Sequence, residues 1–161
     1  MQPSDLGAVS GLAGRLVRLH HALDPQRFIR LKNPEPGYAR WLASEMEKKE
    51  VVLLVAELRG GSVVGYVYAR LEPRSYNELL DACGKIHDVF VDDAVRKKGI
   101  GEALVREAIA RLTAMRAPRT VLMTAVKNEA AQRLFQRVGF RTTMLEMTIE
   151  SEPATGVRPK L

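Results

Sequence analysis

Apolar side chains recur at helical spacing in the first part of the chain. Over residues 5–23 they form one stripe that a helix would present on a single face: Leu6, Val9, Ala13, Leu16, His20 and Leu23. Asp24-Pro25 ends this stretch, because proline cannot continue a helix. After a loop over residues 33–37, the same spacing returns at Tyr38, Trp41, Leu42 and Met46. The sequence therefore predicts two amphipathic helices before any strand.

The pattern then changes to short β-branched runs. Residues 51–58 and 63–69 are nearly continuous apolar runs joined by the turn Arg59-Gly60-Gly61-Ser62, which is typical of a β-hairpin. Residues 71–82 are rich in polar side chains and are expected to form a loop or short helix over the sheet. Residues 85–91 form the third predicted strand.

Helices and strands alternate in the rest of the chain. We expect a helix over residues 100–115, a strand over 120–126, a short helix over 128–139 and a last strand over 140–149. Such alternation predicts the α/β class, with a mixed α+β sheet that has helices on its faces.

Length and composition fit one globular domain. The 161 residues are 46% hydrophobic and 27% charged, a mixture typical of folded rather than disordered chains. We expect residues 1–150 to form this domain, and residues 151–161 to be a disordered C-terminal tail.

Composition also narrows the classes of function. No apolar run approaches the roughly 20 residues that span a bilayer, so no membrane association is expected. The single cysteine, Cys83, cannot form an internal disulfide, and we expect a cytoplasmic protein. No Cys/His cluster has metal-ligand spacing, so no metal is expected. The net charge of +6 fits a diffuse basic surface or a patch for a polyanionic ligand, but no nucleic-acid-binding motif accompanies it.

One segment combines several features of an anion site. Val89-Phe90-Val91 ends a predicted strand, and Arg96-Lys97-Lys98-Gly99-Ile100-Gly101 opens a predicted helix. Free N–H groups at a helix N-terminus hold anions, and glycine lets a ligand approach the backbone. The alternative is an ordinary strand–loop–helix joint, because Arg/Gln-x-x-Gly-x-Gly/Ala arises by chance roughly 0.15 times in a chain of this length. The motif at residues 96–101 lies between a predicted strand and a predicted helix, and this position favours an anion site over an ordinary joint.

A second segment agrees with the first. The run from Asn128 through Ala131 to Gly139-Phe140 again follows a predicted strand. Together the two segments resemble the GNAT superfamily of N-acetyltransferases, which pair an Arg/Gln-x-x-Gly-x-Gly/Ala loop with a downstream Asn…Ala…Gly-Phe helix. The resemblance spans residues 4–150 in element order, although only these two motifs are specific. It implies a GNAT-like fold, with a central, mostly antiparallel twisted sheet flanked by helices.

The resemblance implies acetyl-coenzyme A as cosubstrate. The backbone of the glycine loop would hold the pyrophosphate, and the strand before it would pair with the pantetheine arm. The Val91 amide would bind the thioester oxygen as an oxyanion contact, and Asn128 would bind the pantetheine besides capping its helix. The expected coenzyme-binding residues are Val89, Phe90, Val91, Arg96, Lys97, Lys98, Gly99, Ile100, Gly101, Glu102, Ala103, Asn128 and Phe135.

The implied reaction also needs a proton acceptor. An alkylamine with a pKa of about 10.4 is only about 0.1% neutral near physiological pH, so a base assists its attack. His87 stands where polyamine-type members carry a glutamate, and it is either this general base or a strand histidine in a structural hydrogen bond. Strand alternation places Asp88 on the opposite face from His87.

The chain departs from the family at two points. Many members carry a tyrosine acid at the position of Phe135, which cannot donate a proton. The acid is then water or one of Tyr66, Tyr68, Tyr76 and Cys83, or no acid is needed. The family also opens with a short strand, and residues 1–4 are too few to supply much of it.

The resemblance thus predicts an N-acetyltransferase that acetylates a primary amine by direct attack in a ternary complex. The acceptor, a small-molecule or peptide amine, is expected near residues 24–40 and 71–82. One alternative is a non-catalytic acyl-coenzyme A sensor or regulatory module. The other is a basic interaction domain that binds nucleic acid through residues 96–98, although no nucleic-acid partner is expected. A homodimer is compatible with such folds, but no residue demonstrates one.

Overall fold

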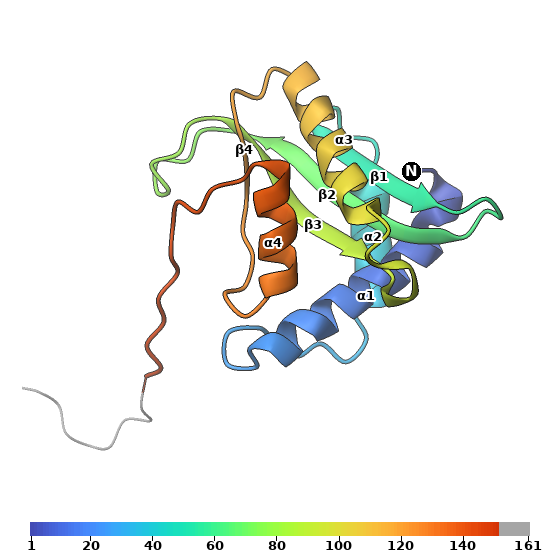
Figure 1. The fold of residues 1–161 in the computed structure, drawn as a ribbon, viewed down its shortest axis with the longest axis horizontal. Coiled ribbons are helices and arrows are strands. Elements are labelled where there is room, and N and C mark those ends of the chain that lie inside the picture. Colours follow the sequence, from blue (N-terminus) through green and yellow to red (C-terminus); the bar gives the residue numbers. More distant parts are fainter. Residues whose placement is uncertain (152–161) are drawn as a thin grey trace, which may run out of the picture.

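The computed structural model describes residues 1–151, so most of the tail expected over residues 151–161 lies outside the described residues. Their elements, in chain order, are the 3-10 turn Pro3–Asp5, α1 (Leu6–Leu23), α2 (Glu35–Glu45), β1 (Val51–Glu57), β2 (Val63–Glu72), β3 (Cys83–Val91), the 3-10 turn Asp93–Val95, α3 (Ile100–Ala114), β4 (Thr120–Leu122) and α4 (Glu129–Val138) (Figure 1). Within residues 1–151 no strand precedes α1.

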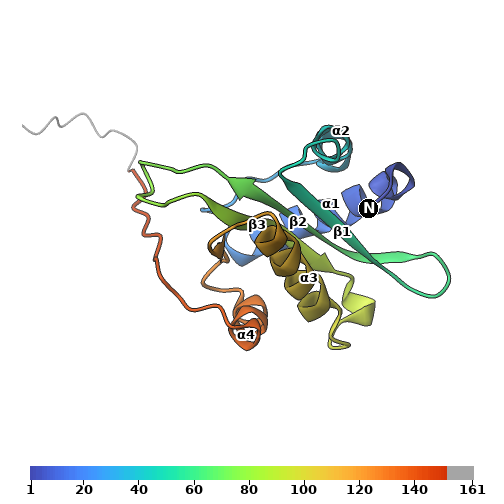
Figure 2. The same cartoon turned by 90° about the horizontal axis from the view of Figure 1, so that it is seen from above.

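The sheet has the strand order β1-β2-β3-β4. β1 and β3 are both antiparallel to β2, whereas β4 is parallel to β3. Figure 2 shows α1 and α2 on one side of this sheet and α3 and α4 on the other. The predicted mixed, mostly antiparallel sheet flanked by helices is confirmed.

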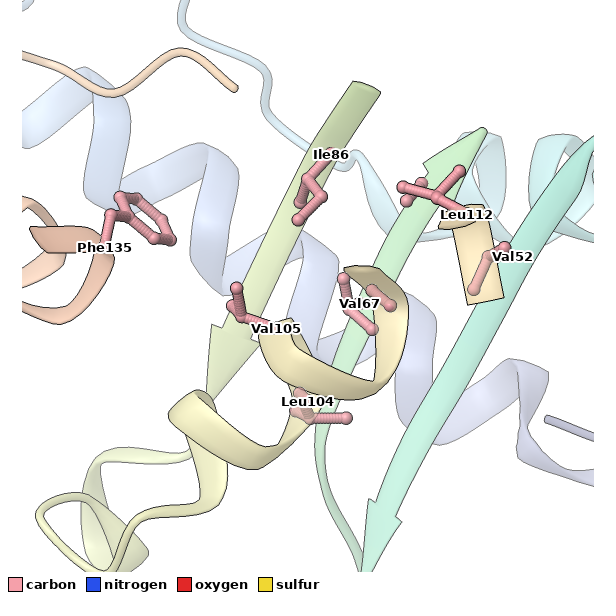
Figure 3. Packing of buried hydrophobic residues seen from close by; sticks show 9 residues of the cluster. Val52, Val67, Ile86, Leu104, Val105, Leu112 and Phe135 are labelled. Atoms are coloured by element: carbon pink, nitrogen blue, oxygen red, sulfur yellow. The ribbon is translucent and has the colours of Figure 1, made fainter. Parts of the chain in front are cut away.

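Each face of the sheet buries its own apolar cluster, because successive strand residues point to opposite faces. Toward α3 and α4, side chains of β1, β2 and β3 pack on the helix positions Leu104, Val105, Ala108, Leu112 and Phe135 (Figure 3). Toward α1 and α2, Tyr66, Tyr68 and Phe90 pack on Val9, Leu12, Ala13, Leu16 and Leu42. The predicted stripe of α1 thus matches its buried face, whereas in α2 only Leu42 of the predicted stripe is buried and Trp41 is 37% exposed.

The pairing of β2 with β3 contains a bulge. Tyr68 lies opposite Asp88, but the next residue of β2, Ala69, lies opposite Ile86. His87 is therefore an extra residue in β3, and the regular alternation of faces is interrupted there.

β4 is shorter than the strand expected over residues 120–126. It pairs with β3 only from Thr120 to Leu122, and the side chains of Met123 and Val126 are 74% and 75% exposed. The expectation was wrong for residues 123–126, because apolar content alone does not supply a neighbouring strand.

The strand expected over residues 140–149 is also absent. Residues 141–150 are exposed, and none is assigned to a strand. In Figures 1 and 2 the segment extends away from the sheet. The alternating sequence favours an extended conformation, but a strand also needs a partner for its backbone N–H and C=O groups.

Candidate active site

The glycine loop brings an exposed helix N-terminus to the end of β3. Gly99, the N-cap of α3, has a φ of 78°, a left-handed conformation that suits glycine. The first bond of the helix runs from the Ala103 N–H to the Gly99 carbonyl at 3.0 Å. The amides of residues 100–102 precede that bond and have no partner within the helix. They therefore form a positively polarised site open to an anion.

Space for a ligand lies beside this turn. A Cβ atom placed on Gly99 would meet no atom within 4 Å, so its open side faces solvent. On Gly101 the same atom would lie 3.3 Å from Leu134 Cδ2, so this second glycine lets α3 approach α4. The two glycines of the motif thus have different structural roles.

The basic side chains of the loop are not equivalent. The Arg96 Nε donates to the Val91 carbonyl at 3.1 Å, and the guanidinium lies 5.3 Å from the Phe90 ring centroid. Arg96 also pairs with Asp93. Lys97 and Lys98 are exposed, and Lys97 itself has a φ of 62°. Arg96 therefore supports the end of β3, whereas the lysines add charge at the surface.

β3 has an open edge next to this helix end. Its other edge pairs with β2 along its whole length, but the edge toward β4 is paired only from Gly84 to Ile86. Within residues 1–151, no strand covers this edge at residues 87–91. An extended molecule with amide groups could pair there as an added strand would.

Asn128 and Phe135 lie on α4, beyond this open edge. The Asn128 Oδ1 accepts a hydrogen bond from the Ala131 N–H at 3.2 Å, so it caps the helix as expected. Phe135 is 8% exposed, and its ring packs on Phe140 with 5.9 Å between centroids. In the structure, Phe135 therefore serves as a core residue.

The other expected coenzyme residues lie in the first turn of α3 or along β3. Glu102 pairs with Arg106 one turn later, at 2.8 Å, and Ala103 is exposed. The side chains of Val89, Val91 and Ile100 are partly buried against the cluster under α3.

Because of the bulge, Asp88 and His87 lie on the same face of the sheet. Asp88 Oδ2 accepts from the Tyr66 hydroxyl at 3.0 Å, and the His87 ring lies 5.3 Å from the ring of Tyr68. Tyr66 and Tyr68 both face α1 and α2. The expectation that Asp88 faces away from His87 was therefore wrong, since simple alternation cannot reveal a bulge.

Asp88 has an unusual electrostatic environment. Burial raises the pKa of its carboxyl above the ordinary value, although the Tyr66 hydrogen bond and the nearby His87 and His20 act in the opposite direction. Burial and the charge of Asp88 also raise the pKa of Tyr38 to about 12, and burial raises that of Tyr66. A carboxylate with increased basicity thus lies beside phenols that stay protonated, a pairing that sequence reasoning missed.

His87 has a different partner. Its Nε2 lies 2.8 Å from Glu72 Oε1, and its side chain is 33% exposed. Glu72, with Cys83 and Lys85, also lines an open groove of about 550 Å³ formed largely by residues 73–80. This groove falls within the expected acceptor region, residues 71–82.

The other acid candidates are less well placed. The Tyr68 hydroxyl donates to the buried carboxylate of Glu45 at 2.7 Å. Tyr76 is 78% exposed in the β2–β3 loop. Cys83 is 1% exposed, and burial raises the pKa of its thiol, which disfavours the nucleophilic thiolate.

The part of the chain that the structure describes lacks two kinds of feature. None of its helices is long and apolar enough to cross a membrane. Over the same residues, no three His, Cys, Asp or Glu side chains form a group that could hold a metal ion.

Comparison with known proteins places this geometry in a family. An uncharacterised N-acetyltransferase of Methanocaldococcus jannaschii is 35% identical over 104 residues, which are 64% of this chain and 43% of that protein, so the chain spans less than half of its relative. A mutant of the BH1408 protein from Bacillus halodurans has the same fold, with a TM-score of 0.81, 20% identity and coverage of 94% and 97% of the two chains. An aminoglycoside N-acetyltransferase, AAC(6')-Iy, solved with coenzyme A, gives a TM-score of 0.72, 16% identity and coverage of 94% and 91%. The acetyltransferase (GNAT) family model matches residues 16–140, and the chain belongs to this family.

Proposed function

We propose that the protein is an N-acetyltransferase that uses acetyl-coenzyme A and acetylates a primary amine by direct attack in a ternary complex. The observation that supports this most is the continuity of two open features, the free edge of β3 at residues 87–91 and the exposed N-terminus of α3. An extended ligand with amide groups and a polyanionic end fits both at once. When bound, acetyl-coenzyme A would supply the acetyl group as an activated thioester.

The chain offers matching groups along that path. The amides of residues 100–102 would hold the pyrophosphate, with Lys97 and Lys98 adding positive charge. The backbone of residues 89–91 would pair with the pantetheine arm, and the Val91 amide would bind the thioester oxygen. Asn128, which already caps α4, would add a side-chain contact from the N-terminal end of that helix.

Two neighbouring side chains are candidates for the general base. Asp88 would accept the proton that the attacking amine gives up, because its raised pKa makes it a better acceptor than an ordinary aspartate. His87, held by Glu72, is the second candidate. Tyr66 and Tyr38 would remain protonated beside the base, and the proton taken from the amine would leave with the thiolate as the free thiol.

The acceptor we propose is a small-molecule amine. The groove is lined by Glu72 and Glu78, and Glu72 also contacts His87, so a cation bound there would lie near the His87 candidate. AAC(6')-Iy, similar in fold, is by its name an aminoglycoside acetyltransferase, which agrees with this class of acceptor.

The test is release of free thiol from acetyl-coenzyme A in the presence of a panel of amines. Asp88→Asn is expected to lower kcat about 10²- to 10⁴-fold while the coenzyme dissociation constant stays unchanged. His87→Gln is the matched comparison from the same bulge, and a larger loss in His87→Gln would assign the base to the histidine. If the wild-type protein binds acetyl-coenzyme A but releases no thiol with any amine, the chain is a sensor or regulatory module instead.

A further inference from the structure

Two carboxylates lie beside the site proposed for a polyanion. Asp92 and Asp93 follow directly after Val91, the last residue of β3. We call residues 92–99, which join β3 to α3, the connector. A carboxylate near the polarised N-terminus of α3 would repel a phosphate bound there, or would compete with it for the free amides. The direction in which these two side chains point therefore bears on coenzyme binding.

Arg15 of α1 holds both carboxylates. Its Nη1 donates to Asp92 Oδ2 at 2.7 Å, and its Nη2 donates to Asp93 Oδ2 at 2.8 Å. The hydrogen bond from Arg15 is the main reason that the pKa of Asp92 lies below its ordinary value. One guanidinium thus spans two consecutive residues of the connector, which its planar fork of donors allows.

Arg15 is itself held in place by the core under α1. The Phe90 ring is buried in that core, and the Arg15 guanidinium lies 5.3 Å from its centroid. Arg96 lies at the same distance from this ring, and it pairs with Asp93 at 2.5 Å. Arg15 and Arg96 therefore share two partners, which couples α1 to the glycine loop.

The connector has few other contacts that could fix its conformation. The Asp92 N–H donates to the Val64 carbonyl at 2.8 Å, and Asp92 Oδ1 accepts from the Ala94 N–H at 2.9 Å. Residues 96–99 are exposed. A segment that buries so little surface depends on its polar contacts for a defined conformation. Arg15 supplies two of these contacts from outside the connector.

We infer that Arg15 is a positioning residue for coenzyme binding, which keeps Asp92 and Asp93 turned toward α1 and away from the N-terminus of α3. It neutralises both carboxylates, so they do not oppose the negative charge of the ligand. It also orders the connector in advance, so less conformational entropy is lost when the pyrophosphate binds. The inference rests on the proposed coenzyme site and assigns no contact between Arg15 and the ligand.

The experiment compares Arg15→Met with Arg18→Met by calorimetric titration with coenzyme A. Both arginines lie on α1 and line the same small cavity of about 230 Å³, but Arg18 pairs with Glu35 of α2 instead of the connector. Arg15→Met should raise the dissociation constant of coenzyme A at least about tenfold, because two carboxylates lose their counter-charge. Arg18→Met should change it less than about twofold, because exposed ion pairs of this kind contribute little.

A shortened donor separates positioning from a general loss of structure. Acetyl-pantetheine lacks the pyrophosphate, so kcat/KM with this donor should be the same in Arg15→Met and in the wild type. With acetyl-coenzyme A, Arg15→Met should raise the KM about tenfold and leave kcat unchanged, whereas a structural defect would lower kcat/KM for both donors alike.

A conservative variant keeps the test informative if Arg15→Met does not fold. Arg15→Lys retains the charge but cannot span both carboxylates, so its dissociation constant for coenzyme A should lie between those of the wild type and Arg15→Met. Wild-type affinity in both Arg15 variants, an equal loss in Arg18→Met, or an equal loss with the two donors would overturn the inference.

Failure of the proposed function would be visible separately. A wild-type protein that binds coenzyme A but acetylates no amine would refute the proposed activity, and the calorimetric comparison of Arg15→Met with Arg18→Met would still decide the role of Arg15. A wild-type protein that binds no coenzyme A would overturn the inference together with the coenzyme site.

Discussion

At the scale of single residues, the bulge at His87 has the largest effect on the site. One extra residue in β3 brings two consecutive polar side chains, His87 and Asp88, to the face of the sheet that carries Tyr66 and Tyr68. A regular strand would have placed only one of them there. The bulge thus doubles the number of candidate bases beside the open edge of β3.

The environment of Asp88 has a thermodynamic consequence. A carboxyl whose pKa is higher in the folded than in the unfolded state binds its proton more tightly when folded. The stability that the protonated carboxyl contributes is fully present below the pKa of the unfolded state. It is lost as the pH rises through the pKa of the folded state. Ionisation of Asp88 therefore destabilises the fold.

Asp88→Asn removes this ionisation while keeping an oxygen that can accept from the Tyr66 hydroxyl. We expect the variant to melt at a higher temperature than the wild type once the pH exceeds the folded pKa of Asp88, by about 2–4 °C for each kcal/mol gained. The difference should shrink as the pH is lowered through the folded pKa, because both proteins are then neutral at this position. Thermal unfolding followed by circular dichroism over a pH series measures this, and a lower melting temperature at neutral pH would contradict the account.

Residue-level inference from the sequence depended on motifs, and the functional roles that it assigned stay predictions. The loop at residues 96–101 was singled out by its place between a strand and a helix, and His87 by the resemblance to the family. Asp88 was assigned to the wrong face because a bulge depends on the register of two paired strands, which one sequence does not display. Phe135 packs on Phe140 in the core, and its expected contact with the coenzyme stays a prediction.

At the scale of elements, the site depends on how closely α3 packs on the sheet. A Cβ atom on Gly84 of β3 would lie 2.7 Å from Leu112 Cδ1 and 3.1 Å from Leu112 Cβ. The missing side chain thus allows the helix to lie against the first residues of β3. This packing fixes the position of the N-terminus of α3 relative to the open edge of β3.

Gly84→Ala should therefore destabilise the protein. We expect the free energy of unfolding to fall by about 1–3 kcal/mol, because Leu112 has to move within a packed core. Gly60→Ala is the matched control, since a Cβ at Gly60 meets nothing within 4 Å. Urea unfolding measures both variants, and equal stability of Gly84→Ala and the wild type would show that the contact relaxes at no cost.

Element-level prediction was strongest where a segment buries a periodic face. The helices and the β1–β2 hairpin were predicted because their apolar patterns match buried surfaces. The strands expected over residues 123–126 and 140–149 were wrong, because their apolar residues have no neighbour within the described chain. The apolar pattern of a segment indicates which conformation it prefers. Whether the segment forms a strand also depends on whether another strand lies beside it to pair with.

At the scale of the whole molecule, the candidate site arises because β4 pairs with only the first part of β3. The two strands pair over only three positions, and the open edge that follows leads directly to the N-terminus of α3. No single segment carries this feature. From the sequence it could be expected only through the resemblance to the family, and the arrangement of the four strands shows its physical basis.

The central claim is that the glycine loop binds the coenzyme, and calorimetric titration with acetyl-coenzyme A tests it most directly. The informative variant is Gly99→Asp, and its matched control is Gly61→Asp. Both glycines have left-handed backbones, with φ of 78° and 80°, and at both a Cβ would meet no atom within 4 Å. The two substitutions therefore impose the same strain and the same charge, and differ only in their distance from the loop.

We expect the wild-type protein and Gly61→Asp to bind acetyl-coenzyme A alike. Gly99→Asp should weaken binding at least about tenfold, because its carboxylate faces the site proposed for the pyrophosphate. Wild-type affinity in Gly99→Asp, or an equal loss in both variants, would contradict the assignment of the coenzyme to this loop.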